Sequence, residues 1–149
     1  MKPTDSTPLA PHHVNSLVPY AHVADVEQSL AFYALFGLGE LGRHCNPSGR
    51  AVWAQAGNGQ ARIMLAQAGP DLRSEEQAVL FYMYCDDVEA LRTYLLAHGV
   101  FDGGKYCGQP GPNGGRRVVF EVNRPFYMEH GELRVSDPDG YVILVGQLS

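Results

Sequence analysis

Two hydrophobic periods follow each other near the start of this chain, and they predict a strand followed by a helix. An apolar run at 17–23 has the aromatic and β-branched content of a β-strand. The next apolar positions recur with a helical period, at Val26, Leu30, Tyr33 and Phe36. Asp25 is predicted to cap the start of this helix, with Gln28 three residues on, and Gly37 is predicted to end it.

The same pattern returns 62 residues later, which indicates one supersecondary unit used twice. Asp25-Val26-Glu27 opens the first helix, and Asp87-Val88-Glu89 occupies the matching place in the second copy. A strand is predicted at 78–85, followed by a helix that Asp86 caps and Gly99 ends. The buried stripe of this second helix is expected at Val88, Leu91 and Leu95.

Each helix is followed by short apolar runs that predict further strands. They are expected at 39–45, 50–55, 61–65, 117–122, 131–136 and 141–147. A hairpin turn is predicted at 57–59, and a long loop rich in glycine and proline at 102–115. The last two strands are joined by Asp137-Pro138-Asp139-Gly140, whose acids we assign to the turn itself.

These elements predict an α+β fold made of two similar units. The predicted boundaries are an N-terminal arm at 1–15, a first unit at 16–66, a linker at 67–77 and a second unit at 78–149. The arm is rich in proline, threonine, serine and histidine and lacks hydrophobic periodicity.

Composition narrows the class of partner. Of the 149 residues, 45% are hydrophobic and 18% are charged, which is enough apolar material for a core. The formal net charge of −5 and the absence of a basic stripe argue against nucleic acid as a partner. No apolar run is long enough to span a membrane, and no secretory signal is visible. Three cysteines without paired spacing suggest free thiols in a reducing cytoplasm.

Two segments, together with the internal repeat, give the chain a family resemblance. Residues 25–33 read Asp-Val-Glu-Gln-Ser-Leu-Ala-Phe-Tyr, and residues 132–141 read Glu-Leu-Arg-Val-Ser-Asp-Pro-Asp-Gly-Tyr. In this order they resemble the vicinal oxygen chelate superfamily, which includes glyoxalase I, extradiol dioxygenases, fosfomycin-resistance enzymes and bleomycin-resistance proteins. The resemblance implies two βαβββ modules whose curved sheets form a cup around a ligand cavity, often completed across a dimer.

The resemblance also implies where a metal would be bound. Metalloenzymes of this family hold it with His, Gln or Glu on the first and last strand of each module. The matching positions here, counted from the helix-opening aspartates and from the last-strand triplets, are Val18, Met64, Leu80 and Leu144. Apolar side chains cannot bind a divalent cation, so we predict neither a metal nor another cofactor. His12-His13 lies too far before Asp25 to replace them and is interpreted as part of the arm.

Strand alternation then predicts which side chains line the cup. The candidate ligand-binding residues are Tyr20, His22, Trp53, Arg62, Met64, Tyr82, Tyr84, Glu132 and Arg134. The face of the sheet on which Trp53 lies is left open. Such a pocket, aromatic with a few charges, suits a planar or amphiphilic small molecule. Alternatively, the aromatic residues pack as core and the charges neutralise one another.

The sequence therefore favours a cytoplasmic, homodimeric protein that binds a hydrophobic or aromatic small molecule without metal, with a cationic drug as one candidate ligand. In character this is closest to the bleomycin-resistance type. The alternative is a glyoxalase I-like lyase or a dioxygenase-like metalloenzyme with a relocated site. A metal-free variant of that enzyme would use Glu132 and His22 for acid–base catalysis. A third hypothesis is a protein that has this fold but binds no ligand, because its own side chains fill the cup.

Overall fold

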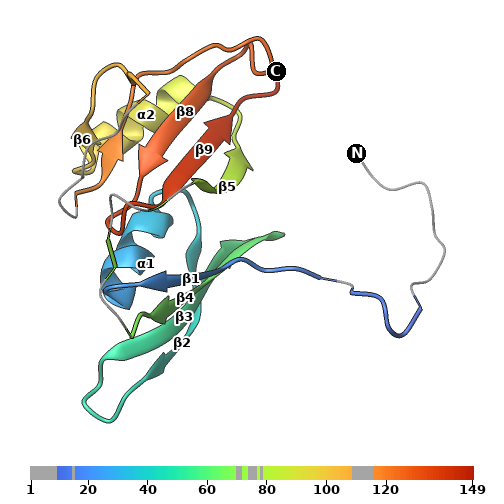
Figure 1. The fold of residues 1–149 in the computed structure, drawn as a ribbon, viewed down its shortest axis with the longest axis vertical. Coiled ribbons are helices and arrows are strands. Elements are labelled where there is room, and N and C mark those ends of the chain that lie inside the picture. Colours follow the sequence, from blue (N-terminus) through green and yellow to red (C-terminus); the bar gives the residue numbers. More distant parts are fainter. Residues whose placement is uncertain (1–9, 15, 70–71, 74–76, 78, 109–115) are drawn as a thin grey trace.

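The structure, a computed structural model, describes residues 10–14, 16–69, 72–73, 77, 79–108 and 116–149. Two mixed sheets with one helix each make up the molecule, so the α+β class is confirmed (Figure 1). The sheets are open and do not close into a barrel.

The first sheet has the strand order β1-β4-β3-β2. Its strands are β1 (Tyr20–Val23), β2 (Gly39–Cys45), β3 (Ala51–Asn58) and β4 (Ala61–Gln67). The first strand runs parallel to the last, and the other neighbours are antiparallel. The run predicted at 17–23 forms a strand only from Tyr20, because Pro19 has no N–H to donate to a ladder.

The second sheet repeats this plan with the order β5-β9-β8-β7-β6. Its strands are β5 (Val79–Tyr84), β6 (Phe101–Asp102), β7 (Val118–Val119), β8 (Glu132–Ser136) and β9 (Val142–Gly146). Again the first long strand, β5, runs parallel to the last.

Two details of the second sheet differ from the sequence prediction. Strand β6 lies at the start of the segment predicted as a loop at 102–115, of which 109–115 is outside the described residues. Strand β7 is shorter than the predicted 117–122 because its pairing with β8 is interrupted: the Glu121 N–H bonds the carbonyl of Gly104 (2.9 Å), and pairing resumes only as an isolated bridge between Asn123 and Glu132.

The helices are α1 (Val26–Ala34) and α2 (Val88–Ala97). Asp25 caps α1 as predicted, accepting from the Gln28 N–H (3.1 Å). For α2 the predicted cap, Asp86, is wrong: Asp87 accepts from the Ala90 N–H (3.0 Å). An N-cap carboxylate reaches the N–H three residues ahead, and Asp87 has the extended backbone that this requires. Gly37 and Gly99 end the helices with positive φ, as predicted. Neither helix, nor any other in the part of the chain that is described, is suited to crossing a bilayer.

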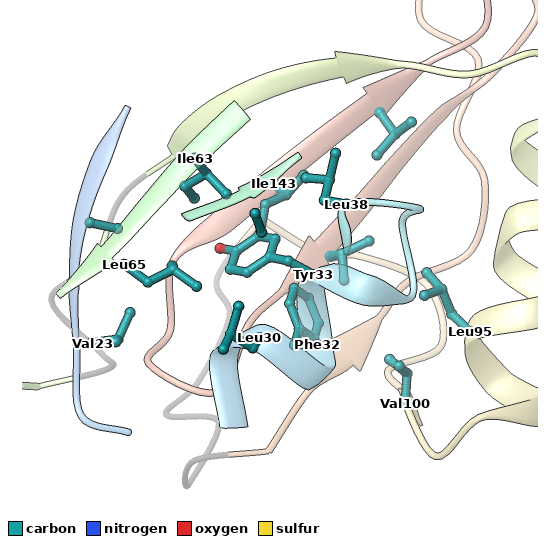
Figure 2. Packing of buried hydrophobic residues seen from close by; sticks show 14 of the residues in the cluster. Val23, Leu30, Phe32, Tyr33, Leu38, Ile63, Leu65, Leu95, Val100 and Ile143 are labelled. Atoms are coloured by element: carbon teal, nitrogen blue, oxygen red, sulfur yellow. The ribbon is translucent and has the colours of Figure 1, made fainter. Parts of the chain in front are cut away.

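One core unites the helix-facing sides of both sheets. Residues of α1 pack with the buried faces of β1, β3 and β4, and the same cluster continues through α2 into β8 and β9 (Figure 2). Tyr33 lies between the two halves: its ring meets the Phe81 ring (centroids 6.1 Å apart), and its hydroxyl donates to Asp137 Oδ2 (2.8 Å).

The turn between β8 and β9 does more than reverse the chain. Asp137 Oδ1 accepts from the N–H groups of Asp139 (2.9 Å) and Tyr141 (3.0 Å), which holds the predicted turn. Asp139 Oδ1 accepts from the Ala24 N–H (3.0 Å), just before α1. Both carboxylates are buried, and burial raises the pKa of Asp139 and raises that of Asp137 to about 7. The two acids therefore join the halves of the protein, a role that the turn signal did not predict.

Candidate functional site

The face of the first sheet that turns away from α1 carries five of the candidate residues. In β1, Tyr20 and His22 are exposed and alternate with the buried Ala21 and Val23. The remaining members follow from the strand register, which places Met64 beside Tyr20, Ala66 beside both His22 and Trp53, and Arg62 beside Gly57.

This register answers the question that the sequence left open for Trp53. Because Trp53 and His22 both pair with Ala66, Trp53 lies on the open face with His22. The Tyr20 and His22 rings meet edge to face (centroids 5.6 Å apart). The open face of the first sheet is thus a partly exposed aromatic surface.

Glu132 is the centre of the corresponding face of the second sheet. It starts β8 and is only 9% exposed. The Tyr82 hydroxyl donates to its Oε2 (2.7 Å), and the Tyr127 hydroxyl donates to its Oε1 (3.3 Å). Tyr82 reaches across Gly146, where a Cβ would lie 2.7 Å from the Tyr82 hydroxyl oxygen. A residue without a side chain at 146 therefore makes this contact possible.

The two phenols are fixed as hydrogen-bond donors. Burial, with the hydrogen bond to Glu132, raises the pKa of Tyr82, and the negative charge of Glu132 raises the pKa of Tyr127. Both hydroxyls therefore keep their protons at neutral pH, and Glu132 is held by neutral partners.

Arg134 lies two residues along β8 on the same face. Its guanidinium stacks on the Tyr106 ring, 4.1 Å from the ring centroid. Its Nε is buried and has no hydrogen-bond partner among the residues that the structure describes. The register places Leu144 between Arg134 and Tyr82.

Glu132, Arg134, Tyr106 and Tyr127 line a cavity of about 300 Å³. The described residues of its wall all come from the second half of the chain: Lys105, Tyr106, Glu121, Val122, Asn123, Tyr127, Glu132, Arg134 and Leu144. We call this the Glu132 cavity. Sequence analysis found Glu132 and Arg134 through strand alternation, but it missed Tyr106 and Tyr127, which lie in irregular segments without a period.

A second cavity, of about 470 Å³, lies where the two halves meet. Arg62, Tyr82 and Tyr84 line it, together with apolar residues that include Leu17 and Phe36. Within the chain the candidates are thus gathered into three groups: the first-sheet face, the junction cavity and the Glu132 cavity. Glu132 is held by tyrosines, and His22 lies on the other sheet, so the acid–base pair of the enzymatic hypothesis is not in contact.

The positions implied for a family metal do not fit one. Met64 lies beside Tyr20 and Leu144 beside Tyr82, and the remaining two positions are Val18 and Leu80. Hydrocarbon and thioether groups are poor ligands for a hard divalent cation. Among the described residues, no three His, Cys, Asp or Glu side chains gather as a metal site requires. His12 and His13 pack ring against ring in the exposed arm.

Comparison with known proteins agrees with this architecture. The family model described as Glyoxalase/Bleomycin resistance protein/Dioxygenase superfamily matches residues 11–145. No curated protein sequence matches the chain.

Solved structures with this fold include binding proteins and an enzyme relative. A bleomycin-binding protein complexed with bleomycin is 15% identical, with a TM-score of 0.62, over 90% of this chain and 98% of that one. An antibiotic binding protein from Streptomyces sp. CB03234 is 21% identical, with a TM-score of 0.59, over 93% and 100%. A glyoxalase-related enzyme from Clostridium phytofermentans is 12% identical, with a TM-score of 0.65, over 92% and 97%. At these identities the similarity concerns the fold.

Proposed function

This chain belongs to the Glyoxalase/Bleomycin resistance protein/Dioxygenase superfamily, and from that premise we propose that it binds an aromatic small molecule without a metal. The observation that carries the proposal is the Glu132 cavity. A nearly buried carboxylate, held by the neutral hydroxyls of Tyr82 and Tyr127, opens on a hollow whose wall combines aromatic and aliphatic residues with several charged and polar ones. Placed polar groups fix the orientation of a ligand in a small-molecule site, and apolar and aromatic side chains hold its body.

The chemistry of the cavity supports a ligand with a flat body and a positively charged group. Tyr106 and Tyr127 offer ring faces and edges, and Leu144 offers an apolar surface. Glu132 accepts two hydrogen bonds from neutral groups, so its negative charge remains available to a cation. The bleomycin-binding and antibiotic binding proteins that share the fold make a drug-like ligand a reasonable first test.

We further propose that the site is completed across a homodimer. The Glu132 cavity is walled by one half of the chain only, whereas the aromatic face with Tyr20, His22 and Trp53 belongs to the other half. A second copy that lays its first sheet over this cavity would cover both surfaces at once, in an isologous pair.

All three cysteines are free thiols, which supports a reducing compartment such as the cytoplasm.

Thermal shift on protein purified without metal tests the proposal. The panel contains bleomycin, ethidium as an aromatic cation, coumarin as a neutral ring system and anilinonaphthalene sulfonate as an aromatic anion. We expect at least one aromatic compound to raise the melting temperature, because a ligand that binds only the folded state stabilises it. Divalent cations added alone are expected to have no effect.

Two variants locate the binding. Glu132→Gln removes the charge and Tyr82→Phe removes one donor, and each is expected to weaken binding of the stabilising compound about tenfold or more. Glu129→Gln and Tyr94→Phe are the matched controls, since both side chains are exposed and outside the cavity. Stabilisation by a divalent cation, or binding that the Glu132 and Tyr82 variants leave unchanged, would contradict the proposal.

A further inference from the structure

We infer that the Glu132 cavity selects zwitterionic aromatic ligands, with Arg134 receiving the ligand's anionic group and Glu132 its cationic group. The inference rests on the proposed function and adds the class of ligand. It starts from two opposite charges on one strand that do not pair with each other.

Glu132 and Arg134 occupy alternate positions of β8 and therefore share a face. Their Cα atoms are two residues apart, about 7 Å along the strand. Opposite charges at such a spacing commonly form an ion pair. Among the ion pairs of the described residues, none includes Glu132 or Arg134. Tyrosines hold the two charges apart: Tyr82 and Tyr127 bind the carboxylate, and Tyr106 stacks on the guanidinium.

Arg134 is incompletely satisfied without a ligand. Its Nε is buried and finds no acceptor in the described part of the chain, which is an unfavourable state for a charged donor. Stacking on Tyr106 occupies one face of the guanidinium and leaves the donors in its plane free to bind an anion in a bidentate way. The wall of the same cavity also carries Lys105 and Glu121, one further charge of each sign, so it offers both a cationic and an anionic group to a ligand. A carboxylate on the ligand would satisfy this end of the site.

At the other end of the cavity, the Glu132 carboxylate would bind the cationic group of the ligand. A carboxylate has about four lone-pair sites, and the two tyrosine hydroxyls use two of them, so that positions remain for an ammonium group. The ring between the two ligand charges would lie against Tyr106, Tyr127 and Leu144. The class predicted is therefore an aromatic amino acid-like molecule whose charges are separated by about 7 Å, the spacing of alternate residues in a strand.

A three-compound series separates the contributions of the two charges. The zwitterion is 4-(aminomethyl)benzoate, its benzamide analogue lacks the anion, and 4-methylbenzoate lacks the cation. Affinities are measured by titration of backbone amide NMR signals, which also shows that each variant is folded. For the wild type, we expect the zwitterion to bind about tenfold or more tightly than either analogue.

Variants at the two charges should remove the two preferences separately. With Arg134→Gln, the zwitterion and the benzamide analogue should bind equally, while affinity for the analogue itself is unchanged. With Glu132→Gln, the preference over 4-methylbenzoate should disappear. Arg134→Lys keeps the positive charge but loses the paired N–H donors of the guanidinium, so it should keep part of the preference for the zwitterion over the benzamide analogue. Arg50→Gln, at an exposed arginine outside the cavity, should behave as wild type.

Equal affinity of the wild type for the zwitterion and the benzamide analogue would overturn the inference, as would an equal loss of both in Arg134→Gln. In either case the proposed function stands if a compound of the thermal-shift panel still binds in a way that depends on Glu132. If neither the series nor the panel binds, both the inference and the proposed function are wrong.

Discussion

The junction between the two halves predicts an unusual pH dependence of stability. Asp137 is buried, and burial raises its pKa in the folded protein to about 7, against an ordinary value of 3.8. Between these two values the folded protein holds a proton that the unfolded chain has lost. Its stabilising contribution is therefore complete at low pH and is lost as the pH rises through about 7. Asp139, whose pKa burial also raises, acts in the same direction.

The magnitude follows from the two values of the Asp137 pKa. Raising the pH from about 5 to about 8 should lower the free energy of unfolding by about 2–3 kcal/mol through this group. Asp137→Asn is uncharged at every pH, and its side-chain oxygen can keep the hydrogen bonds from the Asp139 and Tyr141 N–H groups. The variant should therefore lack this part of the pH dependence and be more stable than the wild type at about pH 8.

Urea unfolding at a series of pH values measures these free energies by linear extrapolation. Asp86→Asn, at an exposed aspartate, is the control and should keep the wild-type slope. If wild-type stability is constant or rises between about pH 5 and pH 8, or if Asp137→Asn is the less stable protein at the higher pH, the reasoning about the buried carboxylate is refuted.

Three further predictions concern the site and the helices. Gly146→Ala should cost about 1–3 kcal/mol of stability in urea and weaken ligand binding, because the new Cβ would meet Tyr82 at 2.7 Å and Met128 at 2.8 Å; Gly42→Ala, with no atom within 4 Å, should do neither. Asp87→Ala should cost about 1 kcal/mol by the same measurement and Asp86→Ala almost nothing, since Asp87 is the cap; equal effects would contradict the assignment. Ligand binding should change the fluorescence of Trp53, the single tryptophan, because it lies on the open face of the first sheet; an unchanged spectrum at saturation would argue against its part in the site.

Much of the fold could be predicted because periodic signals determine it. The helix stops at Gly37 and Gly99, which lie at equivalent positions of the repeat, and the alternation of β1 and β8 all depend on local rules. The cap of α2 was misplaced although the repeat pointed to Asp87, because Asp86 also satisfied the local capping pattern.

Contacts between distant segments could not be predicted in the same way. The Asp-Pro-Asp-Gly signal is sufficient for a turn, so nothing local revealed that Asp137 would bind Tyr33, 104 residues away. Tyr106 and Tyr127 reach the Glu132 cavity from irregular segments, where no period indicates direction. That Glu132 and Arg134 share a face followed from alternation, but their separation by tyrosines is a property of the packed structure.

Mixing two defective variants tests most directly whether the small molecule binds at a site shared between two protomers of a dimer. One variant carries Trp53→Ala in the first sheet, and the other carries Glu132→Gln in the second. Each is unfolded and refolded alone or together with the other, and binding of the compound that most stabilises the wild type is measured by calorimetry. If each site combines the first sheet of one protomer with the second sheet of its partner, every mixed dimer regains one intact site, so that about one site in four binds with wild-type affinity. If the mixture binds no better than the separate variants, the site across the dimer is wrong.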